Sequence, residues 1–280
     1  MKLFVLTALT MIAFAANSVL NRMGLDKAGM DPLHFGTIRL FAGALTLAVL
    51  ALILRRGLQI RGPGRVLSVL SLIIYIYGFS IAYVMLDAGL GALILFGMVQ
   101  VTMFAGAVLN REAIPPLRWL GAGVAFAGLV WLLWPREEVS VPLFHASMMV
   151  LAGVGWGVYS LVGRKATDAL QATAANFLLA APIGLGLGFL RPAVSDISQF
   201  TTEGVALAIL SGAITSGLGY ALWYSLIPAL GAGRAAVAQL SVPVIAIAGG
   251  AVFLAEWPDL RFVIAALIVL GGVGLSLRAK

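Results

Sequence analysis

Long apolar runs are the feature that most constrains how this chain can fold. Within its 280 residues, short polar breaks separate successive stretches of about 20 residues, the length that a helix needs to cross a bilayer. The composition is 61% hydrophobic and only 10% charged, which lies far outside the range of soluble globular domains. The sequence therefore predicts an all-α integral membrane protein with ten transmembrane helices and no soluble domain.

The breaks between the runs carry charged residues, glycine and proline, as in "RRGLQIRGPGR", "WPREE" and "AEWPDLR". The first run also has the basic start and the small residues of a secretory signal peptide. Its pattern returns in mid-chain, however, which favours a retained span. The predicted spans are residues 2–21, 32–54, 65–86, 89–110, 116–134, 142–163, 171–190, 203–227, 233–254 and 260–278.

The second half of the chain repeats motifs of the first half at matching positions. The stretch "FAANSVLNRMGLD" at 14–26 aligns without gaps with "WGVYSLVGRKATD" at 156–168. Later, "AGAVLNREAIPPLR" at 105–118 returns as "GGAVFLAEWPDLR" at 249–261. The aligned residues of the first motif are Phe14 with Trp156, Ser18 with Ser160, Arg22 with Arg164 and Asp26 with Asp168.

These repeats predict two five-helix units at residues 1–134 and 142–280, joined by a linker at 135–141. Because five is odd, the second unit enters the membrane from the opposite face, and the two units are inverted relative to each other. Inverted repeats are typical of secondary transporters, which bind their substrate between the two halves. A duplicated scaffold without a transport role is the alternative.

The positive charges favour one orientation. With a cytoplasmic N-terminus, 12 of the 18 Lys and Arg residues fall on the cytoplasmic side, five fall outside, and Arg39 lies within a span. Positive residues concentrate on the cytoplasmic side of membrane proteins. The sequence therefore predicts that both termini are cytoplasmic, and the formal charge of +7 is interpreted as a topology signal rather than as nucleic-acid binding.

Polar side chains interrupt the apolar surface of the first and sixth spans. In hydrocarbon an unpaired polar group is costly, so such residues are expected to face the bundle interior. There they line a substrate path or satisfy neighbouring helices, and both interpretations are open. The candidates are Asn17, Ser18, Trp156, Tyr159 and Ser160.

Aromatic residues form a second set of candidates. Tyr75, Phe79 and Tyr83 recur every four residues along the third span, and Tyr220, Trp223 and Tyr224 cluster in the eighth, its counterpart in the other unit. Rings and small residues suit a flat apolar solute through stacking and burial of area. Packing between helices is the alternative.

The fourth and ninth spans contain isolated polar residues, Gln100, Gln239 and Ser241, which are further cavity candidates. Pro243 in the ninth span and Pro182 in the seventh remove backbone donors, so each is a candidate hinge.

Arg39 is the one clear charge within a span. Three interpretations are open: its side chain extends outward to the membrane surface, it pairs with Asp87, or it contacts a substrate carboxylate. All eleven acids lie at span ends or in loops, so no candidate proton-carrying carboxylate lies at mid-membrane.

The sequence gives no sign of catalysis or of a bound cofactor. It has no cysteine, no P-loop and no His-Glu-x-x-His motif, so we expect neither a metal nor a cofactor. An intramembrane enzyme is the alternative from another class, and a channel would need rings of like residues around an axis.

The stretch "TSGLGYALWYSLIPALGAGRAAVAQLSVPVIAIAGGAVFLAE" at 215–256 resembles the signature of the EamA-type exporters of the drug/metabolite transporter superfamily. In that family the closing Glu usually follows a Gly, whereas here Arg111 precedes Glu112 and Ala255 precedes Glu256. The resemblance extends over nearly the whole chain. It implies a 5+5 arrangement with peripheral fifth and tenth spans, and substrates such as aromatic amino acids.

Together these features predict a secondary transporter that exports small metabolites, with aromatic amino acids favoured, across the bacterial inner membrane by alternating access. A multidrug or cationic-compound exporter, or another metabolite carrier of the superfamily, is the alternative. The expected partners are a small-molecule substrate and membrane lipids, with no nucleic acid, and the expected state is a monomer or homodimer.

The predicted orientation can be tested because the chain has no cysteine. Single cysteines introduced at Lys2 and Lys280 should both react with a membrane-impermeant thiol reagent only from the cytoplasmic side. Labelling of the two positions from opposite sides, or loss of the Lys2 label through cleavage of the first span, would contradict the inverted arrangement.

Overall fold

The computed structural model describes residues 2–109, 111, 115–134, 142–164, 166–189, 200–239 and 241–278, and within these residues the secondary structure is helical, without strands. The predicted linker 135–141 lies outside the described residues. Seven helices of the described part are long and apolar enough to cross a membrane, and three shorter apolar helices accompany them.

The helices follow the predicted apolar runs closely at most positions. Their bounds are α1 Lys2–Arg22, η1 Met23–Lys27, α2 Pro32–Arg55, α3 Arg65–Ala82, α4 Ala88–Leu109, α5 Pro116–Leu133, α6 Leu143–Gly163, α7 Ala169–Phe189, α8 Thr202–Leu210, η3 Ser211–Leu218, α9 Gly219–Gln239, α10 Ser241–Leu254 and α11 Leu260–Arg278.

The predicted loop at 228–232 is wrong, because the helical backbone of α9 continues through it to Gln239. The proline and glycine of "PALGA" there suggested a turn, but helix propensity is a weak guide that tertiary packing often overrides. A second difference is η3, a π-helical segment between α8 and α9. Such wide turns occur frequently at functional sites.

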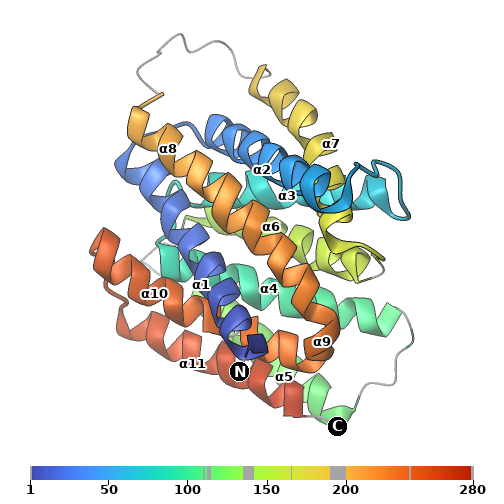
Figure 1. Cartoon of the computed structure of the whole chain (residues 1–280). Coiled ribbons are helices and arrows are strands. Elements are labelled where there is room, and N and C mark those ends of the chain that lie inside the picture. Colours follow the sequence, from blue (N-terminus) through green and yellow to red (C-terminus); the bar gives the residue numbers. More distant parts are fainter. Residues whose placement is uncertain are drawn as a thin grey trace.

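The first helix of each half packs against helices of the other half. α1 packs against η3, α9 and α10, whereas α6 packs against α3 and α4. α2 packs against α7, and α5 packs against α11 at one side of the bundle. Figure 1 shows this arrangement, with both ends of the chain toward the lower end of the bundle.

Glycine residues allow α3 and α6 to approach closely. A Cβ atom on Gly78 would lie 2.7 Å from the carbonyl oxygen of Met148, and one on Gly155 would lie 2.8 Å from the carbonyl oxygen of Ser71. Small residues of this kind bring helix backbones together in membrane proteins. This contact joins the first half of the chain to the second.

The close approach generates a stability prediction. Gly78→Leu should lower the free energy of unfolding by about 1–3 kcal/mol, because the side chain would force two backbones apart. Thermal unfolding in detergent measures the effect. Gly123→Leu is the control, since a Cβ at Gly123 meets no atom within 4 Å, and equal unfolding midpoints for the two variants would contradict the prediction.

Candidate functional site

A small cavity lies between the two halves of the chain. Its volume is about 10 Å³, close to the minimum for one water molecule, so the site is closed to any larger solute in this conformation. The wall residues come from α1, α3, α4, α6 and α9 and are Phe14, Asn17, Ser18, Tyr75, Phe79, Leu95, Phe96, Trp156 and Tyr220.

Trp156 lies at the centre of a cluster of rings. Its ring centroid is 4.6 Å from that of Tyr220 and 4.9 Å from that of Tyr75, and Phe14 packs edge-on at 5.8 Å. The side chain is buried, and its indole nitrogen has no hydrogen-bond partner. Rings from α1, α3, α6 and α9 therefore pack together around an indole N–H that has no acceptor.

Arg39 lies beside this cluster and is fully buried, with 0% of its surface exposed. Its Nε donates to Ser216 Oγ at 2.8 Å, and its Nη2 donates to the hydroxyl oxygens of Tyr75 at 3.1 Å and Tyr220 at 2.8 Å. Its Nη1 has no partner. The guanidinium also lies over the ring of Phe79, 5.0 Å from the centroid.

These contacts contradict two of the three interpretations of Arg39. The side chain does not extend outward, because η3 and two tyrosines surround it, and Asp87 lies instead beside Arg22, at 3.8 Å between Oδ1 and Nη2. The remaining interpretation, contact with a substrate carboxylate, stays a proposal.

Asn17 joins α1 to η3 through a buried polar network. Its Oδ1 accepts hydrogen bonds from Ser211 Oγ at 2.6 Å and Thr215 Oγ1 at 2.8 Å. Its Nδ2 donates to the hydroxyl oxygen of Tyr75 at 3.4 Å. The acceptor capacity of the Asn17 side chain is therefore largely used within the protein.

Other predicted residues lie one layer further out. Tyr83 packs against Phe79, and Tyr159 stacks on Trp156. Trp223 packs against Phe14, and Tyr224 packs against Tyr159.

A further group of predicted residues is not brought to the cavity wall. Ser160 donates to the carbonyl oxygen of Trp156 in its own helix, and Ser241 is exposed and donates to Ala238. The side chains of Gln100 and Gln239 each leave one buried amide atom without a partner. Pro182 lies inside α7 and Pro243 in the first turn of α10, so their hinge roles stay predictions.

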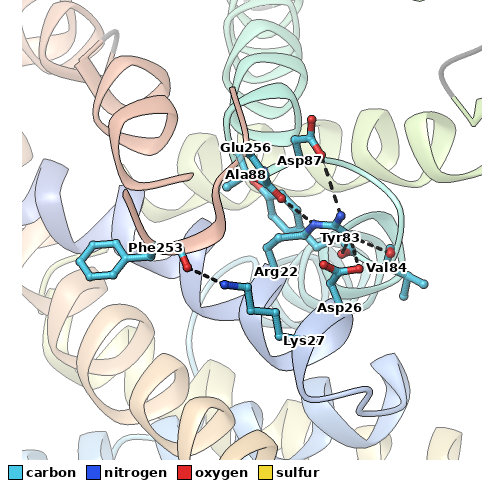
Figure 2. Close-up of polar contacts among 9 residues, drawn as sticks. All are labelled: Arg22, Asp26, Lys27, Tyr83, Val84, Asp87, Ala88, Phe253 and Glu256. Atoms are coloured by element: carbon cyan, nitrogen blue, oxygen red, sulfur yellow. Dashed lines mark hydrogen bonds and ion pairs between the residues drawn. The ribbon is translucent and has the colours of Figure 1, made fainter. Parts of the chain in front are cut away.

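The outer end of the bundle, as the predicted orientation defines it, is closed by Arg22. Its Nε donates to Glu256 Oε1 at 2.8 Å, and its Nη1 donates to the carbonyl oxygens of Tyr83 at 3.1 Å and Val84 at 2.8 Å. Figure 2 shows these contacts converging from α1, the α3–α4 turn and the segment after α10.

Glu256 completes this closure, which we call the outer latch (Arg22, Glu256 and the backbone of Tyr83, Val84 and Ala88). Its Oε2 accepts from the backbone N–H of Ala88 at 2.7 Å. Burial raises the pKa of Glu256 despite the hydrogen bonds from Arg22 and Ala88. Arg22 and Glu256 are only 11% and 13% exposed, so this ion pair is shielded from water.

The opposite end is closed by a different set of contacts. Arg55 Nε donates to Asp168 Oδ2 at 2.6 Å, and Arg65 Nη1 donates to Asn176 Oδ1 at 2.6 Å. Burial opposes ionisation of Asp168, but hydrogen bonds from Gln171 and Arg55 outweigh it and lower its pKa. A polar cavity of about 160 Å³ lies beside these contacts.

Tyr220 belongs to the aromatic group predicted in the eighth span, and the structure places it in the cavity wall. Three residues of the site were not among the sequence candidates. Ser211, Thr215 and Ser216 gave no signal, because their role depends on η3, whose wide turns the sequence does not predict.

Comparisons with known proteins agree with a transporter. A model of the EamA-like transporter family matches residues 1–134 and 143–278. An uncharacterized protein of Pseudomonas aeruginosa is 44% identical over 98% of this chain and 94% of its own length. The uncharacterized transporter YoaV of Bacillus subtilis is 24% identical over 88% of this chain and 87% of its own length.

Two further proteins are similar to this chain at lower sequence identity. An uncharacterized transporter of Archaeoglobus fulgidus is 22% identical over 90% of each chain. A solved crystal structure with 19% identity covers 97% of this chain and 98% of its own, with a TM-score of 0.68, which shows a shared fold. Because the family match covers both halves of the sequence, this chain belongs to the EamA-like transporter family, as a multi-pass membrane transporter.

Proposed function

We propose that this chain is a secondary transporter that exports small metabolites, with aromatic amino acids favoured, across the bacterial inner membrane by alternating access. The proposal includes ten spans in two inverted five-helix units, residues 1–134 and 142–280, with both termini cytoplasmic. It is supported by the helix contacts, because α1 packs against η3, α9 and α10 of the second half, and α6 packs against α3 and α4 of the first half.

The observation that carries the proposal is a closed cavity between the halves with closures at both ends. At about 10 Å³ the cavity excludes an amino acid, so a substrate enters only when the helices separate. The outer latch and the Arg55–Asp168 ion pair lie at opposite ends of the bundle. Opening one closure while the other holds would expose the cavity to one side at a time.

The alternative of a cationic-drug exporter fits this site less well. A cationic ligand at the cavity would lie close to the buried guanidinium of Arg39, whose hydrogen-bond partners are all hydroxyl groups. Like charges in a low-dielectric interior repel strongly. The rings around Trp156, in contrast, suit a flat aromatic substrate.

The proposed role of Trp156 can be tested in proteoliposomes loaded with labelled phenylalanine. Trp156→Ala should reduce efflux at least about tenfold, because the substrate loses its largest stacking surface, whereas Trp156→Phe should retain part of the flux. Trp119→Ala is the matched control, since Trp119 is 55% exposed on α5 and packs against Phe104. Unchanged efflux by Trp156→Ala would remove this residue from the site.

The outer latch generates a second test in the cysteine-free chain. Ser18→Cys places a thiol at the cavity wall, where Ser18 is 1% exposed. Adding Arg22→Gln should raise its labelling rate by an impermeant reagent from the outer side about tenfold, since a broken buried pair destabilises the closed end. Arg55→Gln at the opposite end should leave this rate unchanged. Equal rates for the Arg22 and Arg55 variants would show that Arg22 does not hold the outer end closed.

A further inference from the structure

We propose that the central site binds a monoanionic aromatic carboxylate through Arg39, and that the inside-negative membrane potential drives its export. The inference rests on the proposed transport function and specifies the charge of the substrate and its driving force. Among the small aromatic metabolites of that proposal, it predicts that an aromatic acid is preferred to the zwitterionic amino acid.

The charge of Arg39 is not balanced by any acid in the described part of the chain. The ion pairs found there involve Arg22, His34 and Arg55 and lie at the ends of helices. The hydrogen-bond partners of Arg39 are neutral hydroxyl groups. A buried charge is stable only when it is paired or well hydrogen-bonded, so an anion at this position would complete the site.

Two buried donors beside the cavity have no acceptor. They are Nη1 of Arg39 and Nε1 of Trp156, and both side chains contact the ring of Tyr75. Hydrogen bonds from a guanidinium N–H to a carboxylate are charge-assisted and stronger than those between neutral groups. A carboxylate that enters as the cavity opens would therefore find a cation and unused donors next to the rings of Tyr75, Phe79 and Trp156.

The same site offers little to an ammonium group. Among the wall residues, the Asn17 carbonyl oxygen is a strong neutral acceptor, but Ser211 and Thr215 already donate to it, which leaves the weaker hydroxyl oxygen of Ser18. A zwitterion would therefore bring an ammonium group without an acid to pair with, which is costly in a buried site. We expect the order anion, then zwitterion, then cation for ligands that share one ring.

The negative charge of such a substrate also sets the direction of transport. Moving one negative charge outward across an inside-negative membrane is favourable, and a potential of about 100 mV sustains about a 50-fold outward concentration ratio. Export of this kind needs no carboxylate that carries protons through the membrane centre. The acids of the described residues accordingly lie at helix ends and in loops.

The test uses proteoliposomes loaded with phenylpyruvate, phenylalanine or phenyltrimethylammonium, which present a phenyl ring with negative, zwitterionic and positive charge. A potassium diffusion potential set with valinomycin makes the lumen negative or positive. Phenylpyruvate should leave at least about tenfold faster than the other two probes, and at least about tenfold faster with a negative than with a positive lumen. Protein-free liposomes give the background leak.

Variants of Arg39 distinguish an effect on recognition of the anion from an effect on folding. Arg39→Gln should lower phenylpyruvate efflux at least tenfold while its phenylalanine efflux persists, and Arg39→Lys should keep the preference for the anion. The control is Arg261→Gln, because Arg261 donates to carbonyl oxygens of Trp131 and Trp134 between α5 and α11, away from the cavity.

The outcomes distinguish this inference from the proposed function. Phenylalanine efflux that exceeds phenylpyruvate efflux, or phenylpyruvate efflux that is indifferent to the potential, would overturn the inference and leave the transporter proposal intact. The same holds for an Arg39→Lys variant that loses the anion preference. Absence of protein-dependent efflux of every probe would overturn both.

Discussion

A single guanidinium buried in an apolar bundle is the constraint on which the central structure depends. Arg39 has 0% of its surface exposed, and lipid offers no water to solvate it. The protein therefore surrounds it with hydroxyl groups from α3, η3 and α9. The π-helical turn of η3 presents Ser216 to Arg39 and Ser211 to Asn17, which ties the first half of the chain to the second.

Because the same groups join the halves and face the cavity, the proposed substrate binding would be coupled to the packing of the two halves. Tyr75 accepts from Arg39, contacts Asn17 and packs against Trp156. Separation of the helices would disturb these three contacts of Tyr75. A bound ligand would form new contacts that replace some of them. In the proposed mechanism, the substrate would favour the change between conformations in this way.

The two ends of the bundle differ in how they are closed. At the end that holds the outer latch, Arg22 and Glu256 are shielded from water. Arg22 also donates to the backbone carbonyl oxygens of Tyr83 and Val84, and Glu256 accepts from the backbone N–H of Ala88. At the other end, Arg55 and Asp168 form a more exposed pair, at 49% and 28%. Exposed pairs contribute little to stability, whereas breaking a buried pair is costly. The Arg22–Glu256 ion pair is therefore the better shielded of the two ion pairs.

Much of the fold followed from local sequence, because span length and apolarity are set by the bilayer rather than by tertiary contacts. The helices α1 to α7 begin and end within a few residues of the predicted runs. The exception at 228–232 arose where alanine-rich sequence permits both a turn and a helix. Tyr75 and Phe79, spaced four residues apart, were candidates for either cavity lining or packing, and the structure places both in the cavity wall. Their contact with a substrate stays a prediction.

The sequence by itself determined that the chain is a helical membrane protein with a repeated unit, and that Arg39 is an unusual charge within it. Only the tertiary structure decided what Arg39 contacts, because its partners Ser216 and Tyr220 lie more than 170 residues away along the chain. The same is true of Arg22 and Glu256, 234 residues apart. Hydrophobic periodicity reports which face of a helix is buried, but hydrogen bonds between distant segments depend on how those faces meet.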